Sequence, residues 1–252
     1  MKNNRNLFAL VTLILLLSTI SCQKENFNED ANFRFASSDG DSKIECIDFE
    51  IPSWHYGQIV NTVFTTDGGN AIEVYGVNPS YKGTNAAMIF NSTNPLQFSG
   101  DYDLASPNER FGGSGQGKGG ALEPFANRDP LGKILIVSED LEAFNPNDIE
   151  TESRVVFDFL DWGYFKLHSM TVIDIEESSN KLNASTMRPR VELQNKDGRV
   201  LAEAALPYTG DNGVANVFFD RNIGNVVGAT KLVVFLPGSG GIDNICFEKA
   251  EY

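Results

Sequence analysis

The chain has 252 residues, and its 34 acidic side chains outnumber 20 basic ones to give a formal net charge of −14. A surface this acidic argues against nucleic acid and anionic lipid headgroups as partners, because both bind clustered lysine and arginine. Calcium ions and neutral ligands suit an acid-rich surface better.

The first 21 residues have the layout of a cleaved secretory signal. Lys2 and Arg5 precede an apolar-dominated run at residues 7–20, and small residues then lead to Cys22. The run is shorter than the roughly 20 apolar residues that a membrane-spanning helix needs. We therefore predict a signal peptide at residues 1–21. Its removal takes away two basic residues and no acid, which changes the net charge from −14 to −16.

The sequence STISC at residues 18–22 resembles the lipobox of bacterial lipoproteins, in which the cysteine is acylated. The resemblance implies several acyl chains on Cys22, and two or more chains anchor a protein stably to a membrane. The acidic stretch at residues 23–30 is similar to a tag that directs some Gram-negative lipoproteins to the outer leaflet of the outer membrane. A solvated tether would also be acid-rich, which is the alternative interpretation.

Beyond the lipidated cysteine, residues 22–43 lack apolar periodicity and are predicted to form a flexible acidic tether. The rest of the chain, residues 44–252, is long enough for one well-buried core. We therefore expect a single folded domain after the tether.

Short segments rich in Val, Ile and Phe recur throughout this domain, separated by glycine-rich and asparagine-rich turn signals. No window sustains the apolar stripe of an amphipathic helix. The pattern predicts an all-β fold, a jelly-roll-like antiparallel β-sandwich. In chain order, the expected strands are residues 44–51, 71–77, 86–90, 133–137, 154–160, 165–175, 190–193, 200–206, 214–219, 231–236 and 242–247.

Two cysteines remain once Cys22 is lipidated, and they lie in similar sequence contexts near the two ends of the domain. These are Cys46 and Cys246. An oxidising compartment allows them to form a disulfide if the first and last strands are neighbours. Two free, buried thiols are the alternative.

The order of motifs along residues 44–248 resembles an extracellular β-sandwich module of secreted bacterial proteins that has no settled activity. The opening Asp48-Phe49-Glu50 and the closing Ile242-Asp243-Asn244-Ile245 also resemble jelly-roll carbohydrate-binding modules, in which acids of the first and last strands hold a structural calcium. The resemblance implies Asp48, Glu50 and Asp243 as calcium ligands. Carboxylate oxygens are ligands that calcium prefers.

A long glycine-, asparagine- and proline-rich segment at residues 91–129 is expected to be an ordered, functional loop. It contributes to a second candidate calcium site, with backbone carbonyls as additional ligands. The candidate side chains are Asp101, Asp103, Asn108, Glu109, Glu139 and Asp140. Simple solvation of surface acids is the alternative.

Enzyme motifs are incomplete. The glycines of residues 115–120 have a dinucleotide-binding spacing but no βαβ context. The stretch Asp174-Ile175-Glu176-Glu177 resembles half of the carboxylate motif of jelly-roll glycoside hydrolases, but Val172 stands where that motif has its nucleophile. We therefore predict that the protein is not an enzyme.

Aromatic side chains are candidate platforms for a sugar ring, because they offer apolar faces with a polar edge. The candidates are Trp54, Tyr56, Tyr81 and Tyr102, and core packing is the alternative for Trp54. The sequence thus predicts a membrane-anchored, cell-surface protein that binds an extracellular glycan. A structural adhesin or accessory subunit that binds a protein partner is the alternative, and a hydrolase with an unfamiliar carboxylate site is a third interpretation.

Overall fold

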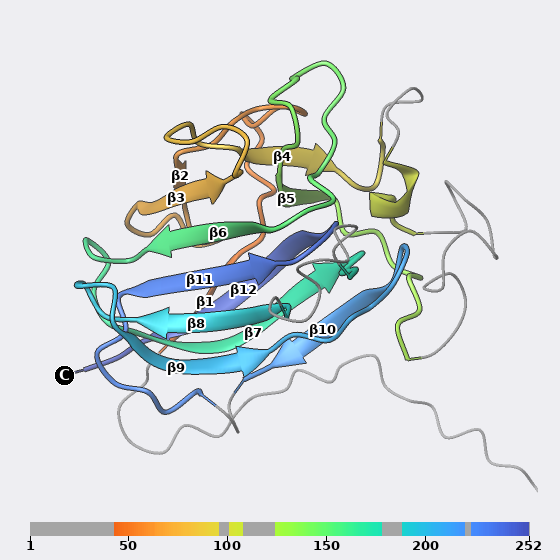
Figure 1. Cartoon of the computed structure of the whole chain (residues 1–252). Helices are drawn as coiled ribbons and strands as arrows, with labels where there is room; N and C mark the ends of the chain where they lie inside the picture. The colour runs from red at the N-terminus through yellow and green to blue at the C-terminus, as the bar shows by residue number, and fades with distance from the viewer. Residues whose placement is uncertain (1–42, 96–100, 108–123, 178–187, 220–222, 252) are drawn as a thin grey trace, which may run out of the picture. The chain divides into compact units, whose positions relative to one another are not determined.

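Two antiparallel β-sheets make up the part of the chain that the structure describes (Figure 1). This computed structural model describes residues 43–95, 101–107, 124–177, 188–219 and 223–251. All of them belong to one compact unit, Asp41–Tyr252. The predicted signal peptide, Cys22, nearly all of the predicted tether and Asn108 lie outside the described residues.

Sheet A has the strand order β10-β7-β12-β5-β4, and β1 also pairs with β12. Its strands are β1 (Ile44–Ile47), β4 (Ala87–Asn91), β5 (Lys133–Val137), β7 (Phe165–Ile173), β10 (Val214–Phe218) and β12 (Gly241–Lys249). The long strand β12 pairs with β7 on one side; on its other side the first residues of β12 pair with β5 and the later ones with β1. The first and last strands of the domain are therefore neighbours.

Sheet B has the strand order β2-β3-β6-β11-β8-β9. Its strands are β2 (Thr62–Val63), β3 (Ile72–Val77), β6 (Ser153–Asp158), β8 (Arg190–Gln194), β9 (Val200–Ala205) and β11 (Lys231–Leu236). Side chains of β3 and β6 alternate between buried and exposed positions, as expected for strands with one face on a core and one face in water.

The core lies between the two sheets and is rich in phenylalanine. Phe159 stacks on Phe165 with ring centres 4.1 Å apart, and Phe247 meets Phe159 edge-on at 4.8 Å. All three side chains are fully buried, and each stabilises the fold by about 1.5–3 kcal/mol relative to an exposed position. A smaller apolar cluster covers the other face of sheet A, where Leu104 of the 3₁₀ helix η1 (Tyr102–Leu104) is buried with Phe90. Among the described residues, no such apolar cluster covers the outward face of sheet B.

The all-β sandwich predicted from the sequence is confirmed, and each of the eleven expected segments contains a strand. The strand ends differ from the expected ones by up to four residues. At the end of β7, which stops at Ile173, the next residue Asp174 (φ 58°) takes a left-handed conformation, and Phe49 (φ 56°) takes one shortly after β1. The two-residue strand β2 was not expected. Within the described ranges, no helix is long and apolar enough to cross a membrane.

The predicted disulfide is present. Cys46 of β1 lies opposite Cys246 of β12 in the antiparallel register, and their sulfur atoms are bonded. The bond joins residues 200 positions apart in the sequence. It therefore ties the two ends of the domain together along one strand pair.

Candidate functional site

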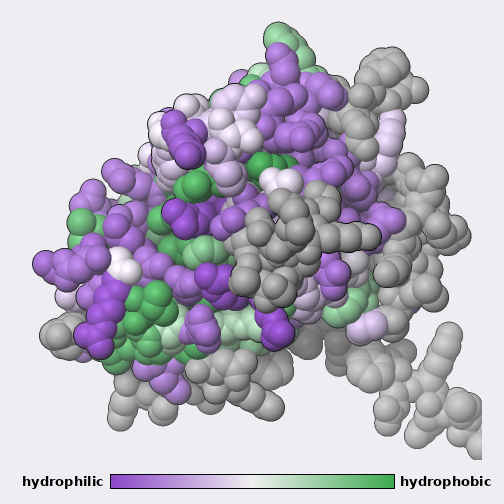
Figure 2. All heavy atoms as spheres, viewed as in Figure 1, coloured by the Kyte–Doolittle hydropathy of each residue, from purple (hydrophilic) through white to green (hydrophobic). Residues whose placement is uncertain are grey.

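Outward-pointing side chains of sheet B form rows across its strands, because opposite residues of paired strands share a face. In the order β3, β6, β11 and β8, one row contains Val77, Arg154, Phe235 and Arg190. The next row, in the same order, contains Tyr75, Val156, Val233 and Glu192. Figure 2 shows hydrophobic and hydrophilic residues intermingled over this face. The sheet therefore presents aromatic, aliphatic and charged groups within reach of one another.

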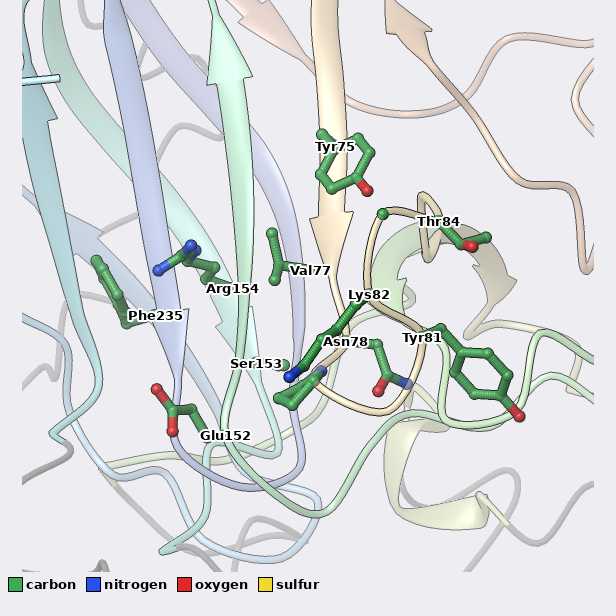
Figure 3. Close-up of a pocket in the computed structure, with 12 residues that line it drawn as sticks. Tyr75, Val77, Asn78, Tyr81, Lys82, Thr84, Glu152, Ser153, Arg154 and Phe235 are labelled. Carbon is green, nitrogen blue, oxygen red and sulfur yellow. The ribbon is translucent and has the colours of Figure 1, made fainter. Parts of the chain in front are cut away.

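A groove of about 480 Å³ crosses the end of this face (Figure 3). Its walls come from β3, the following turn at residues 78–84, the start of β6 and Phe235 of β11. Tyr75 and Tyr81 line it with 36% and 37% of their surface exposed. A second hollow of about 380 Å³ shares Tyr75 and continues along β3 and β6 toward Thr62. Volumes of this size are typical of small-ligand sites.

The turn that carries Tyr81 is held in place by Asn78, which is 1% exposed. The Nδ2 atom of Asn78 donates to the carbonyl oxygens of Ser138 and Glu139 at 2.7 and 2.9 Å. Its Oδ1 atom accepts the backbone N–H of Ser80 at 2.8 Å. The groove wall is thus organised by buried hydrogen bonds before a ligand arrives, which lowers the entropy cost of binding.

Two cationic side chains, Lys82 and Arg154, line the groove. Among the described residues, neither side chain has a hydrogen bond or an ion pair. The guanidinium of Arg190, by contrast, lies 3.7 Å from the centre of the Phe235 ring and donates two hydrogen bonds to Glu192 at 3.0 and 2.8 Å. Arg190 is therefore engaged in holding Phe235, whereas Lys82 and Arg154 are available to a ligand.

Of the four aromatic residues predicted to bind a ligand, the structure places Tyr81 in this groove. Trp54 is 8% exposed, and both Trp54 and Tyr56 pack against core phenylalanines. Tyr102 lies in η1 with 38% of its surface exposed. The four residues are not brought together in one groove.

Sequence reasoning missed Tyr75, Arg154 and Phe235. One signal was available: the strand Ile72–Val77 alternates, and its alternation puts Tyr75 on the polar face with Glu73. A large aromatic residue on the solvent side of a strand is a candidate binding group. That Tyr75 and Phe235 line the same groove depends on the strand order β3-β6-β11, which the sequence does not reveal.

The seam between β1 and β12 brings Asp48, Glu50 and Asp243 close to one another. Asp243 is 1% exposed, and its Oδ1 atom has no hydrogen-bond partner among the described residues. Burial, followed by the charges of Glu50 and Asp48, raises the pKa of Asp243 to about 8. Glu50 accepts the backbone N–H of Lys133 at 2.6 Å, and Asp48 accepts that of Glu50 at 3.1 Å. An unpartnered buried oxygen beside two further carboxylates fits the oxygen donor set of calcium.

A second acidic group contains five aspartates: Asp101, Asp103, Asp148, Asp174 and Asp211. Single oxygen atoms of Asp103, Asp174 and Asp211 all lie within 4.8 Å of one another. The backbone N–H of Asp148 donates to Asp101 at 2.9 Å. The segments that carry these residues are far apart in the sequence and meet at the end of β7, beside η1 and the turn before β10.

Burial and mutual repulsion favour the protonated state of four of these carboxyls, those of Asp101, Asp103, Asp148 and Asp174. Burial raises the pKa of Asp101 to about 8 and that of Asp148 to about 7, and it raises the pKa of Asp174 well above its ordinary value. The Oγ atom of Ser239 lies 2.7 Å from Oδ2 of Asp148 and also contacts Oδ2 of Asp174. A hydroxyl carries one proton, so one of these two contacts needs a protonated carboxyl as the donor.

The second predicted calcium site is divided by the fold. Asp101 and Asp103 belong to the five-aspartate group, and the charge of Glu139 contributes to the raised pKa of Asp101. Asp140 is exposed and accepts the backbone N–H of Glu142 at 2.8 Å. Asn108 and Glu109 lie outside the described residues. Calcium binding by this set stays a prediction.

Three aspartates of the group were not among the predicted ligands: Asp148, Asp174 and Asp211. Asp174 and Asp211 are in motifs that stand out in the sequence, the Asp174-Ile175-Glu176-Glu177 stretch and the Gly210-Asp211-Asn212-Gly213 turn. The hydrogen bond from the backbone N–H of Asn212 to Asp174, at 2.6 Å, joins the two motifs in space. Nothing in the local sequence of either motif predicts this contact.

No family model matches the chain, and no curated protein matches it. Three solved structures show weak similarity. The first is a His 62 mutant of the lectin binding domain of lectinolysin complexed with Lewis b, at 13% identity and a TM-score of 0.25, covering 41% of this chain and 68% of that one. The second is the C-terminal CBM6 of LamC, a marine laminarinase from Zobellia galactanivorans, at 16% identity and a TM-score of 0.27, covering 50% and 86%.

The third is the arabinose-bound MgGH51 α-L-arabinofuranosidase, at 12% identity and a TM-score of 0.34. That similarity covers 84% of this chain but 27% of the arabinofuranosidase chain. At these TM-scores, the assignment of a β-sandwich depends on the strand pairing of this chain itself.

Proposed function

We propose that this protein is a lipid-anchored cell-surface lipoprotein whose β-sandwich binds a glycan in the groove of sheet B. The observation that carries the proposal is the groove, about 480 Å³ in volume, with Tyr75 and Tyr81 exposed on its walls. Sugar rings pack their C–H faces on such aromatic surfaces, while polar groups at the edge fix their orientation. The hollow that continues past Tyr75 gives room for a second sugar residue.

Binding without cleavage is part of the proposal. Most glycoside hydrolases use a pair of carboxyl groups on either side of the scissile bond. Glu152 is the one carboxylate among the twelve residues that line the groove. The adjoining hollow is lined by Glu73 and Asp158, and the carboxylate of Asp158 lies 3.0 Å from Nζ of Lys231, so it is engaged in an ion pair.

Calcium at the seam is proposed as the structural cofactor, with Asp48, Glu50 and Asp243 as its side-chain ligands. The support is the unpartnered Oδ1 atom of the buried Asp243 carboxyl. A bound calcium ion would offset most of the negative charge of the three side chains once Asp243 has lost its proton. Its role is to hold the two ends of the domain together, away from the groove.

The test of glycan binding is a glycan array followed by calorimetry on the wild type and two variants. Tyr75→Ala and Tyr81→Ala each remove an aromatic wall and should weaken binding about tenfold or more. Tyr208→Ala removes a tyrosine with 38% exposure that does not line the groove, so it should leave the affinity unchanged. Binding that survives both groove variants would refute this site, and an array without any bound glycan would favour a protein partner.

A further inference from the structure

The charge of the groove differs in sign from that of the whole chain. The chain carries a net charge of −14, whereas the charged residues that line the groove are two cations, Lys82 and Arg154, and one acid, Glu152. At physiological ionic strength, charges farther away than about 8 Å are largely screened. Among the residues that line the groove, the cations therefore outnumber the acids by one.

Lys82 and Arg154 differ from two other cations on this face, which are paired with acidic side chains. Arg190 donates to Glu192, and Lys231 lies 3.0 Å from Asp158. Arg154 has Val77 and Phe235 as its cross-strand neighbours, and neither can accept a hydrogen bond from its side chain. Within the described ranges the guanidinium of Arg154 and the ammonium of Lys82 have no acceptor, although both are positioned by a rigid strand or turn.

The two cations line the same groove as Tyr75, Tyr81 and Phe235. Figure 3 shows Arg154 beside Phe235, and Lys82 between Arg154 and Tyr81. The guanidinium of Arg154 lies 5.9 Å from the centre of the Phe235 ring, and Figure 3 shows it extending toward that ring. A planar guanidinium matches a carboxylate or sulfate with two parallel hydrogen bonds, and a lysine adds a point charge.

We infer that the groove selects anionic saccharides, in which a uronate carboxylate or a sulfate ester binds Arg154 and Lys82 while the sugar ring packs on Tyr75 or Tyr81. The inference depends on the proposed function, because it names the ligand class of the same groove. Glu152 also lines the groove, and its negative charge repels an anionic saccharide. The anion is therefore expected to bind on the side of Arg154 and Lys82. A neutral saccharide of the same linkage lacks the charged contacts and binds more weakly.

The test compares matched saccharides. Oligosaccharides of galacturonate, mannuronate and glucuronate are titrated next to their carboxyl-reduced forms, and a sulfated galactan next to its desulfated, neutral form. The uronate pairs and the sulfate pair distinguish the two sources of the anion. We expect at least one anionic member to bind about tenfold more tightly than its neutral counterpart, because a hydrogen bond to a charged group is worth more than a neutral one.

Variants connect this preference to the groove. Arg154→Gln and Lys82→Gln should each lower the affinity for the anionic member about tenfold and leave that for the neutral member within about twofold, whereas Glu152→Gln should raise the anionic affinity. Arg199→Gln removes the same charge from an exposed position after β8 and should change neither affinity. Thermal melts confirm that each variant folds.

The outcomes separate this inference from the proposed function. Equal or tighter binding of the neutral members, or an anionic preference that is unchanged in Arg154→Gln, would overturn the inference and leave glycan binding standing. Failure of every saccharide, neutral and anionic, to bind the wild type would overturn both.

Discussion

Cys46 and Cys246 lie directly opposite each other in β1 and β12, and a disulfide joins them across this strand pair. The bond closes a loop with a sequence separation of 200 residues. By the chain-entropy argument, a loop of that size is worth about 5 kcal/mol, and native disulfides commonly contribute about 2–5 kcal/mol. The disulfide also keeps Asp48 and Glu50, which follow β1, close to Asp243 of β12.

The first prediction concerns this bond. The double variant Cys46→Ala, Cys246→Ala should unfold with a free energy about 2–5 kcal/mol lower than the oxidised wild type. Urea unfolding followed by tryptophan fluorescence measures the difference. Reduction of the wild type should reproduce most of the loss, and the double variant should not respond to reductant. Equal stability of oxidised and reduced protein would contradict the prediction.

The second prediction concerns pH. The pKa values of Asp101, Asp148 and Asp243 are raised to about 8, 7 and 8 by burial, whereas an unfolded aspartate titrates near pH 4. Between about pH 4 and 8 the folded, metal-free protein therefore binds more protons than the unfolded chain, and its stability falls as the pH rises. Calcium-free urea unfolding should give a higher free energy at pH 5 than at pH 8.

A variant isolates one of these carboxyls. Asp148→Asn removes a group that is 6% exposed and should flatten the slope by up to about 1.4 kcal/mol per pH unit between pH 4 and 7. Asp197→Asn, at an exposed turn, should leave the slope unchanged. A free energy that rises steadily from pH 5 to pH 8 without calcium would show that these carboxyls are ionised in the folded protein.

The third prediction concerns calcium. Addition of calcium to chelated protein should raise the melting temperature, because an ion at 100 times its dissociation constant stabilises the folded state by about 2.7 kcal/mol. Asp48→Asn should remove most of this shift if the ion binds at the seam, whereas Asp211→Asn should preserve it. The reverse result would assign the ion to the five-aspartate group. Affinity should also weaken below about pH 8, because Asp243 must lose its proton to bind the metal.

The fourth prediction concerns the anchor. Cys22→Ala should block lipidation and move the protein from the membrane fraction to the soluble fraction of the cell. Ser37→Ala, a small change further along the same segment, should leave the protein in the membrane fraction. Protease treatment of intact cells tests surface display, since an exposed lipoprotein is cleaved and an inward-facing one is protected. Membrane retention of the Cys22→Ala protein would refute the lipid anchor.

The strands and their sandwich class could be predicted from local alternation, because burial on one face imposes a period of two. Val155 and Phe157 are buried and Arg154 is exposed, as their spacing requires. The two residues of β2 are too few to show a period. The neighbouring positions of β1 and β12 could also be predicted, because Cys46 and Cys246 repeat one sequence context at the two ends of the domain.

The groove and the five-aspartate group could not be predicted, because each combines segments whose adjacency is a property of topology. Tyr75, Arg154 and Phe235 belong to β3, β6 and β11, which are consecutive in sheet B but not in the chain. The same holds for Asp101 and Asp148, 47 residues apart and joined by one hydrogen bond. Tyr81 could be identified as a candidate from its residue type alone. The same criterion also selected Trp54, which is buried in the core.

The position of the disulfide has a mechanical consequence. A pull on the chain ahead of Lys43 enters the folded domain through β1, whose third residue is Cys46. Peeling of β1 from its neighbour would stop at that covalent link after two residues, and the load would pass into β12, at the middle of its sheet. A domain held at its N-terminal side against flowing water would thereby transmit shear force to its best-supported strand instead of unravelling from its edge.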